Sequence, residues 1–169
     1  YNAFSYADIA NQIGITKASI HYYFPSKDAL CQEVVRRYRA TQQSRLVQID
    51  QQTAGAREKL ELYIHLYADI LQDPDRLCVC GMLACDSLTL SNELRLEVQH
   101  YFTSHEEWLI NVFTQGVQTG VVRITGSVEH EAHLWVATLQ GALLMAHAFQ
   151  EVSRYHMVTQ QLLQGLLAK

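Results

Sequence analysis

Three residues near the start of the chain constrain its fold more than any others. Ala10, Gly14 and Ile20 stand at the spacing that two short helices need when a tight turn joins them at a steep angle. A small residue lets the helices cross closely, a glycine adopts the left-handed backbone of the turn, and an aliphatic side chain fills the space between the helices. Further aliphatic residues are expected to close this core: Ile9, Ile13 and Ile15. The pattern predicts a helix-turn-helix, with an ordinary helical hairpin of a bundle as the alternative.

Capping signals support both predicted helices. Ser5, with Asp8 three residues later, is typical of the start of a helix, and Thr16 can cap the second helix. Because a helix-turn-helix places its second helix in the major groove, double-stranded DNA is the first partner to consider.

The segment after the turn resembles the DNA-binding signature of TetR-type transcriptional repressors. Residues 15–30 read ITKASIHYYFPSKDAL, and the match extends from Phe4 to about Leu30. The resemblance implies an all-α fold, with a helix-turn-helix DNA-binding domain over residues 1–30 and a ligand-binding and dimerisation domain over residues 31–169. Members of the family carry a further helix before this segment, so the sequence is expected to be a fragment that lacks the first helix.

The resemblance also implies which side chains meet a palindromic DNA operator. The start of the second helix faces the base edges, whereas the tyrosine hydroxyls, the Lys27 ammonium and the cap of the first helix reach phosphates. Tyr23 has a place in the core as its alternative, and Phe24 is expected to be core. The DNA-binding residues predicted in this way are Ser5, Thr16, Lys17, Ala18, Ser19, His21, Tyr22, Tyr23 and Lys27.

The charge of the chain is unevenly distributed, in a way that suits this partner. The net charge is −4, but the first 45 residues carry six basic and three acidic residues, and the remainder carries seven basic and 14 acidic residues. A basic end attracts phosphate and an acidic body is repelled by it, which orients the encounter with DNA. No signal segment and no apolar run of membrane-spanning length occur, so a soluble, cytoplasmic protein is expected.

Apolar residues at helical spacing continue through the rest of the chain. In the first of these helices, Leu30, Val34 and Tyr38 are expected to share one face, and Asp73-Pro74-Asp75 is expected to break the second. The segments predicted to be helical are residues 26–50, 60–71, 76–88, 91–116, 127–149 and 155–167.

Residues 132–149 are apolar on nearly every side of their helix, so all sides are expected to be buried. A chain of this size has no single core large enough to surround such a helix, and we expect a second subunit to cover one side. The family resemblance also places dimerisation on the last two helices. A central core helix of a monomer is the alternative. The interface residues predicted are Leu139, Ala142, Leu143, Ala146, Leu162 and Leu166.

A regulator with a second, apolar domain is expected to respond to a small-molecule effector that is itself apolar or aromatic. Occupancy would shift the helix over residues 27–50 and change the spacing of the two recognition helices. Asp86 would orient a polar group, with a helix cap or a solvated position as its alternative. The pocket is predicted from aromatic and sulfur-containing side chains together with that aspartate: Tyr63, Tyr67, Met82, Cys85, Asp86, Trp108, Phe113, Trp135 and Met145.

The cysteines and histidines leave an alternative open. Cys78 and Cys85 are expected on one helix face near Cys80, in a spacing that suits zinc poorly, so no metal site is predicted. A thiol-based sensor of oxidants or electrophiles that uses these three cysteines is the alternative to an effector pocket. His100, His105, His130 and His133 are expected on the surface or satisfied in the core.

Enzymatic motifs are missing from the sequence. It contains no Gly-x-Ser-x-Gly, no His-Glu-x-x-His and no phosphate-binding glycine loop, so no catalytic residue and no cofactor are predicted. A helical enzyme without a recognisable motif is the alternative from a different class.

Overall fold

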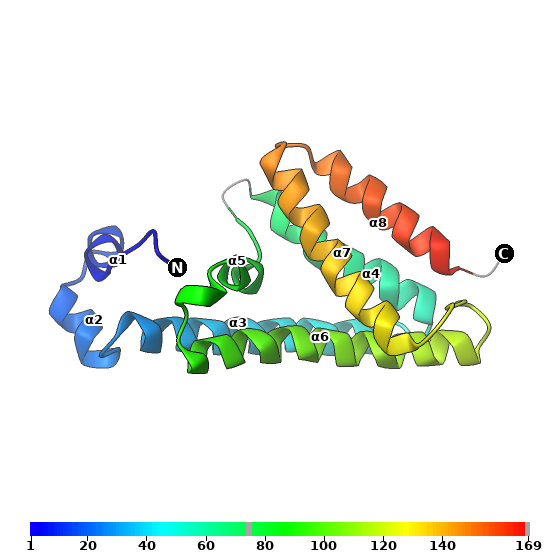
Figure 1. Ribbon diagram of the computed structural model, residues 1–169, viewed down its shortest axis with the longest axis horizontal. Coiled ribbons are helices and arrows are strands. Elements are labelled where there is room, and N and C mark those ends of the chain that lie inside the picture. Colours follow the sequence, from blue (N-terminus) through cyan, green and yellow to red (C-terminus); the bar gives the residue numbers. More distant parts are fainter. Residues whose placement is uncertain (74–75, 168–169) are drawn as a thin grey trace. The chain divides into compact units, whose positions relative to one another are not determined.

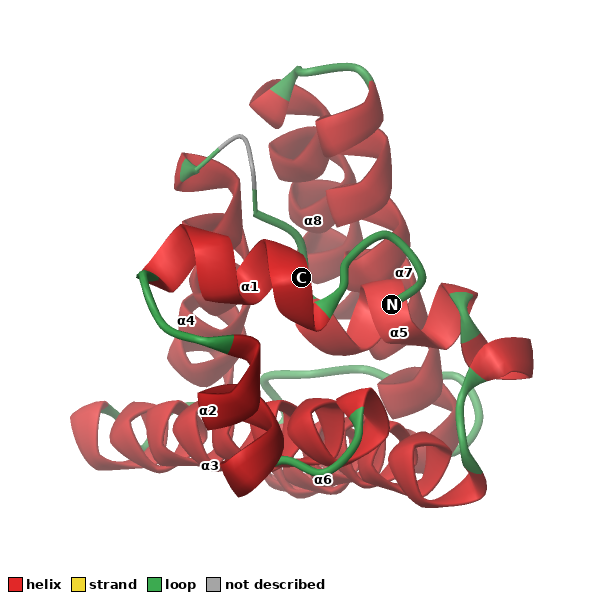
Figure 2. Ribbon diagram, turned by 90° about the vertical axis from the view of Figure 1, so that its left-hand side faces the viewer, coloured by secondary structure: helices red, strands yellow, loops and turns green. Residues whose placement is uncertain are grey.

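The computed structural model describes residues 1–73 and 76–167, and this part of the chain is helical (Figure 1). Loops connect the helices and no strand is formed in these ranges, where the one isolated β-bridge joins Val122 to Leu167 (Figure 2). The predicted all-α fold is confirmed. The α-helices are α1 (Tyr6–Ile13), α2 (Lys17–Tyr23), α3 (Lys27–Gln52), α4 (Ala56–Ala68), α5 (Val79–Cys85), α6 (Asn92–Gln118), α7 (Val128–Ala148) and α8 (Val152–Leu166), with short 3-10 turns η1 (Asp69–Gln72) and η2 (Ser87–Thr89).

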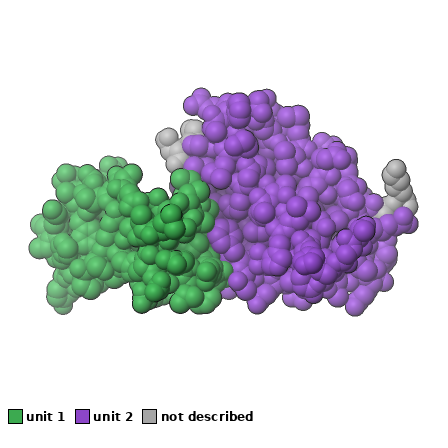
Figure 3. Space-filling view, in the orientation of Figure 1, with its two compact units in different colours: residues 1–41, 79–101 green, residues 42–78, 102–169 purple. Residues whose placement is uncertain are grey.

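The chain divides into two compact units, each made from two separate segments (Figure 3). Unit 1 comprises residues 1–41 and 79–101, and unit 2 comprises residues 42–78 and 102–169. The long helices α3 and α6 each supply residues to both units. The predicted boundary at residue 30 divides the chain into a DNA-binding and a ligand-binding domain, which are not the same division as the two compact units. That boundary stays a prediction.

The helix-turn-helix of unit 1 is built around a small core. Tyr6 and Ala10 of α1 pack with Ile20 of α2, and Gly14 takes the left-handed conformation at φ 73°. Ile9, Phe24 and Leu30 are partly buried and pack against this core. Ile13 and Ile15 are instead 59% and 43% exposed, so their prediction as core residues is wrong. A helix of eight residues buries one narrow face, and that face is taken by Tyr6 and Ala10.

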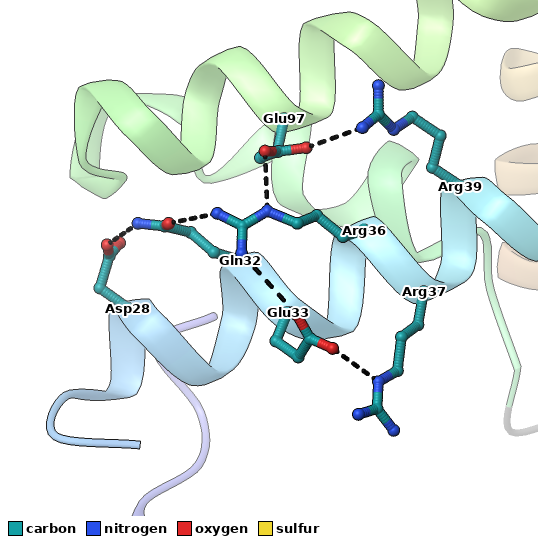
Figure 4. Close-up of polar contacts among 7 residues, drawn as sticks. All are labelled: Asp28, Gln32, Glu33, Arg36, Arg37, Arg39 and Glu97. Carbon is teal, nitrogen blue, oxygen red and sulfur yellow. Dashed lines mark hydrogen bonds and ion pairs between the residues drawn. The ribbon is translucent and has the colours of Figure 1, made fainter. Parts of the chain in front are cut away.

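An ion-pair network joins α3 to the start of α6 within unit 1 (Figure 4). Glu97 of α6 accepts from Arg36 Nε at 3.0 Å and lies 3.4 Å from Arg39 Nη2. Arg36 also donates to Gln32, and Arg37 pairs with Glu33 at 2.8 Å. The Glu97 side chain is only 16% exposed, so its half-buried carboxylate links α6 to two arginines of α3.

The buried face of α3 differs from the predicted one by a single position. Val34 is 45% exposed, whereas Val35 is completely buried. Cys31, Leu46 and Ile49 are also buried on this helix. Charged residues dominate its middle, so an apolar stripe of three residues did not suffice to fix which side faces the core.

The core of unit 2 lies among α4, α7, α8 and the second half of α6. Figure 1 shows α7 alongside α8, and the chain reverses between them at Gln150, the one non-glycine residue of the described ranges with positive φ. Tyr155 of α8 donates to the carbonyl oxygen of Ile64 in α4 at 2.7 Å. Gly116 allows close approach at the end of α6, because a Cβ there would lie 2.7 Å from Val122 Cγ2.

Two predicted helices have different ends. The helix expected over residues 76–88 is limited to α5, and Cys78 precedes it, so the prediction that Cys78 and Cys85 share a helix face is wrong. The helix expected from residue 155 begins three residues earlier, at Val152. Glu151 directly precedes it, and its carboxylate accepts hydrogen bonds from the side chains of Ser153 and Arg154. Of the predicted break at residues 73–75, Pro74 and Asp75 lie outside the described residues. Among those that are described, no helix is both long enough and apolar enough to cross a lipid bilayer.

Candidate functional site

The second helix of the helix-turn-helix presents most of its side chains to solvent. Tyr22 is 83% exposed and Tyr23 is 73% exposed, with their rings in edge-to-face contact at 5.0 Å. Tyr23 is therefore not a core residue, whereas Phe24 packs partly against the core as expected. The polar start of the helix is also exposed, as are its middle positions: Lys17, Ala18, Ser19 and His21.

Two of the predicted DNA-binding hydroxyls are engaged by neighbouring groups. The backbone N–H and the hydroxyl of Ser5 both donate to Asp8 Oδ2 at 2.7 Å, which completes a capping box on α1. Thr16 caps α2 by accepting from the backbone N–H of Ser19, and the two hydroxyls lie 2.9 Å apart. The hydrogen bonds from Ser5 lower the pKa of Asp8 below its usual range. The Asp8 carboxylate therefore accepts from both Ser5 donors that were expected to meet a phosphate.

Lys27 is likewise engaged inside the protein. Its ammonium donates to the carbonyl oxygen of Phe4. It also lies 3.9 Å from the centroid of the Phe4 ring and 4.8 Å from that of Tyr1. The predicted phosphate contact of Lys27 would require this side chain to leave these partners.

Several residues of the predicted ligand pocket meet in the core of unit 2. Tyr63 and Tyr67 are buried and their hydroxyls lie 3.0 and 3.5 Å from His105 Nδ1. Trp108 stacks on Tyr63 at 5.2 Å and donates from its indole N–H to Asp50 at 3.0 Å. His105 is not among the predicted pocket residues, and it was expected either on the surface or satisfied in the core. Its place on α6, three residues before Trp108, is the signal that could have added it.

Burial controls the protonation of this cluster. Desolvation lowers the pKa of His105 to about 4, so the imidazole is neutral at neutral pH. Burial also raises the pKa of Tyr63 well above its usual value. The cluster is therefore a neutral set of hydrogen-bonding groups in an apolar core.

The other predicted pocket residues fall into three groups. Phe113 and Trp135 are completely buried and pack edge to face at 5.4 Å, and the indole N–H of Trp135 has no acceptor among the described residues. Met145 is 53% exposed on α7. Met82, Cys85 and Asp86 belong to unit 1, where Asp86 accepts from the main-chain nitrogen of Tyr1 and the side chain of Asn2. The nine residues do not all belong to one compact unit.

A cavity of about 510 Å³ lies at the turn between α7 and α8 in unit 2. Among its lining residues, Leu71 stands four positions after Tyr67 of the tyrosine cluster in the sequence. Its lining mixes aliphatic and polar side chains: Leu71, Asp73, Leu77, Ala146, His147, Gln150 and Val152.

The predicted interface residues require a correction. Leu139, Ala142, Leu143, Ala146 and Leu166 are at most 5% exposed, because the chain's own helices cover them, and Leu162 is half-buried. A different stripe of α7 is exposed, at intervals of three and four residues: Leu134, Ala137, Gly141, Met145 and Ala148. A groove of about 680 Å³ runs from this stripe to Met157 and Val158 of α8. One side of this helix is therefore left uncovered within a single chain, as the prediction of a second subunit requires, and its burial by a partner stays a prediction.

The cysteines occupy different surroundings. Cys78 and Cys80 are buried, and Cys78 Sγ accepts from Gln140 at 3.4 Å. Cys85 is exposed and donates to the carbonyl oxygen of Gly81 at 3.5 Å. No group of three or more His, Cys, Asp or Glu side chains in the described part of the chain is placed to hold a metal ion.

Known proteins resemble both the DNA-binding head, which comprises the helix-turn-helix of α1 and α2, and the chain as a whole. Residues 1–34 match the model of bacterial regulatory proteins of the tetR family. A solved structure of a TetR-family transcriptional regulator from Agrobacterium tumefaciens is 33% identical in sequence, with a TM-score of 0.96 over 99% of this chain and 89% of that one.

Two further relatives agree. A TetR transcriptional regulator from Legionella pneumophila is 27% identical, with a TM-score of 0.88 over 98% of this chain and 88% of its own. The fatty acid metabolism regulator protein of Bacillus subtilis (strain 168) is 23% identical over 157 residues, which are 86% of this chain and 80% of that protein. The identity and coverage of the Agrobacterium relative, together with the match of the head, show that this chain belongs to the TetR family of DNA-binding transcriptional regulators.

Proposed function

We propose that this regulator is a homodimeric repressor that leaves a palindromic operator when a small, largely apolar effector binds in unit 2. The observation that carries the proposal is the pairing of an exposed recognition helix with a buried cluster of polar aromatic side chains in one chain. Operator binding places the protein in the cytoplasm with the chromosome.

Operator contacts are assigned to the exposed face of α2. Lys17 and the hydroxyls of Tyr22 and Tyr23 are the groups available for phosphates, and Ala18, Ser19 and His21 face the bases. A palindromic operator follows from two-fold symmetry, because two heads of a dimer read two half-sites one helical turn apart.

The effector is assigned to the core of unit 2. The buried indole N–H of Trp135 lacks an acceptor among the described residues, and a buried donor in this state is unfavourable by about 1 to 3 kcal/mol. An effector with an apolar body and one hydrogen-bond acceptor would satisfy it. The relative named for fatty acid metabolism supports the same class of molecule. The cavity at Leu71 and Val152 is the proposed route of entry.

The two tryptophans provide a matched test of the effector site. Trp135→Phe removes the unsatisfied donor, whereas Trp108→Phe removes a donor that Asp50 already satisfies. Fatty acids of graded chain length, and hydrocarbons of the same length, are titrated against the protein bound to a duplex selected from a random library. Fluorescence of the remaining tryptophan reports effector binding, and a mobility shift reports DNA release.

We expect a fatty acid to release DNA from the unmodified protein and from Trp108→Phe at similar concentrations. Trp135→Phe should need about tenfold more, the equivalent of one hydrogen bond, with no such loss for the hydrocarbon. Equal responses of the two variants would show that the effector does not accept a hydrogen bond from Trp135. Release by oxidants or electrophiles alone, abolished by Cys85→Ser, would favour the thiol sensor instead.

Dimerisation is assigned to the exposed stripe of α7 with the neighbouring groove on α8. Small residues on this stripe let helices approach closely, and open space surrounds the position that a Cβ of Gly141 would take. Leu134 and Met145 would supply the apolar contacts, each being more than half exposed in the single chain.

Charge substitutions on the two sides of α7 distinguish the faces. Leu134→Glu should leave a folded monomer in sedimentation experiments, because the new carboxylate would be buried only against a partner. Leu143→Glu should unfold the protein instead, since Leu143 is 1% exposed within the chain. A stable dimer of Leu134→Glu would exclude this face.

A further inference from the structure

We infer that Glu97 is a two-position clasp between α6 and α3: it exchanges Arg36 for Arg39, and this exchange sets the position of α3 and of the recognition helix α2 that precedes it. The three residues of the clasp all belong to unit 1. The inference concerns DNA binding by the head, so it does not depend on the proposed effector or on the repressor role.

The two arginines are held unequally by the same carboxylate (Figure 4). Arg36 Nε donates to Glu97 Oε1 at 3.0 Å, which is the distance of an ordinary hydrogen bond. Arg39 Nη2 lies 3.4 Å from Glu97 Oε2, and this ion pair includes no hydrogen bond. Glu97 therefore binds Arg36 fully and Arg39 incompletely.

Complementary atoms are left unused on the incomplete side. Glu97 Oε2 and Arg39 Nε are both buried, and neither has a hydrogen-bond partner among the described residues. An acceptor and a donor that have lost water without gaining a bond are unfavourable. They belong to the same carboxylate and the same guanidinium that already lie 3.4 Å apart. A small shift of α3 along α6 would therefore complete the second pair.

The same shift would break the first pair. Arg36 is tied to its own helix, because it donates to Gln32, which in turn donates to Asp28 in the first turn of α3. These bonds move with α3, so Arg36 leaves Glu97 when α3 moves. Arg36 and Arg39 stand three residues apart, about 4.5 Å along a helix axis, which is the upper limit of the shift. The two positions of the clasp therefore exclude each other.

The head follows any movement of α3. Leu30, near the start of α3, packs against the core of the helix-turn-helix, and only residues 24–26 separate α3 from α2. Ile20 is the one α2 residue that is buried, and it belongs to the same core. A change in the position of α3 therefore changes where α2 lies. Apparent affinity for DNA then follows the fraction of molecules in the competent position.

Three glutamine substitutions test the exchange. Arg36→Gln and Arg39→Gln each remove one partner of Glu97, and Arg37→Gln is the matched control because its guanidinium is 79% exposed and pairs with Glu33. Each variant loses one positive charge, so a general electrostatic effect on DNA binding is common to all three. The probe is a duplex selected from a random library by the unmodified protein. Affinity is measured by mobility shift at one salt concentration, well below the unfolding temperature of every variant.

Relative to the control, Arg36→Gln and Arg39→Gln should change the affinity in opposite directions, each by about fivefold, because each removes a different position of the clasp. Both effects should disappear in the Glu97→Gln background. In protein with isotope-labelled arginine, hydrogen exchange of the Arg39 Nε–H should slow in Arg36→Gln, since the completed bond protects it. Arg36→Lys and Arg39→Lys keep the charge without the planar fork, and they replace a glutamine variant that does not fold.

Four results would overturn the inference. Changes in the same direction, or a change confined to one arginine, would make the two residues ordinary anchors of α3. Affinities equal to that of the control would confine the exchange to the side chains. Effects that persist in Glu97→Gln would show that the arginines act through another partner. An unchanged exchange rate of the Arg39 Nε–H in Arg36→Gln would show that Glu97 does not change partners.

Discussion

The buried imidazole of His105 makes the stability of this protein depend on pH in a calculable way. Its side chain is 1% exposed and burial lowers its pKa from 6.5 to about 4. Between these two values the unfolded chain binds a proton that the folded protein does not, so stability is fully present above pH 6.5 and is lost as the pH falls.

The size of the loss follows from the two pKa values. At pH 5 the unfolded state gains about 2 kcal/mol relative to the folded state from this one residue, and near pH 4 the loss approaches about 3 kcal/mol. That is a large part of the roughly 5 to 15 kcal/mol by which domains are stable.

Urea unfolding at pH 7.5 and pH 5, followed by circular dichroism at one fixed protein concentration, measures the effect. His105→Gln keeps an acceptor near the Tyr63 hydroxyl but cannot titrate, so its loss between the two pH values should be smaller by about 2 kcal/mol. His100→Gln, at an exposed position of the same helix, is the control. Equal pH dependence in His105→Gln and the unmodified protein would refute the assignment.

Three further substitutions test other contacts. Glu97→Gln should lower the free energy of unfolding by about 1 to 2 kcal/mol, because Arg36 would lose a half-buried ionic partner, and a thermal melt measures the loss. Gly116→Ala should destabilise unit 2 by about 1 to 3 kcal/mol in the same assay, since the new Cβ would overlap Val122; an unchanged melt would mean that the loop shifts freely. Ser5→Ala should remove the cap of α1 at a cost of about 1 kcal/mol, seen as faster amide exchange there, and unchanged exchange would show that the cap contributes little.

The helix-turn-helix could be predicted from the sequence because its determinants are local. A capping box, one left-handed glycine and one buried isoleucine all act within about 15 residues. The fates of Ser5 and Lys27 could not be predicted in the same way. Their partners, an aspartate three residues on and the carbonyl of Phe4, compete with DNA for the same donors, and residue types alone do not decide that competition.

Most of the residues predicted for the interface are buried within the chain itself, for a reason of geometry. An all-apolar helix contains both a core face and an outer face, and its composition does not distinguish them. The prediction rested on larger residues such as Leu139 and Leu143, which are buried in the core of unit 2. The exposed stripe with Gly141 could be found only once the packing of α7 on α8 was known.

The structure brings only some of the predicted pocket residues together. Tyr63, Tyr67 and Trp108 meet in one cluster because α4 and α6 carry them at helical spacing. Met82, Cys85 and Asp86 were added for their chemistry, and they belong to the other unit because the chain returns to unit 1 at residue 79. Such a return has no local signal in the sequence.

That return has a consequence for engineering the protein. Unit 1 is built from residues 1–41 and 79–101, so a chimera that exchanges only the first segment with a homologue would join two halves of a core that never evolved together. Glu97 would then face foreign residues in place of Arg36 and Arg39. A graft intended to give this regulator a new operator should stop before α3, and one intended to give it a new sensor should carry residues 79–101 with the head.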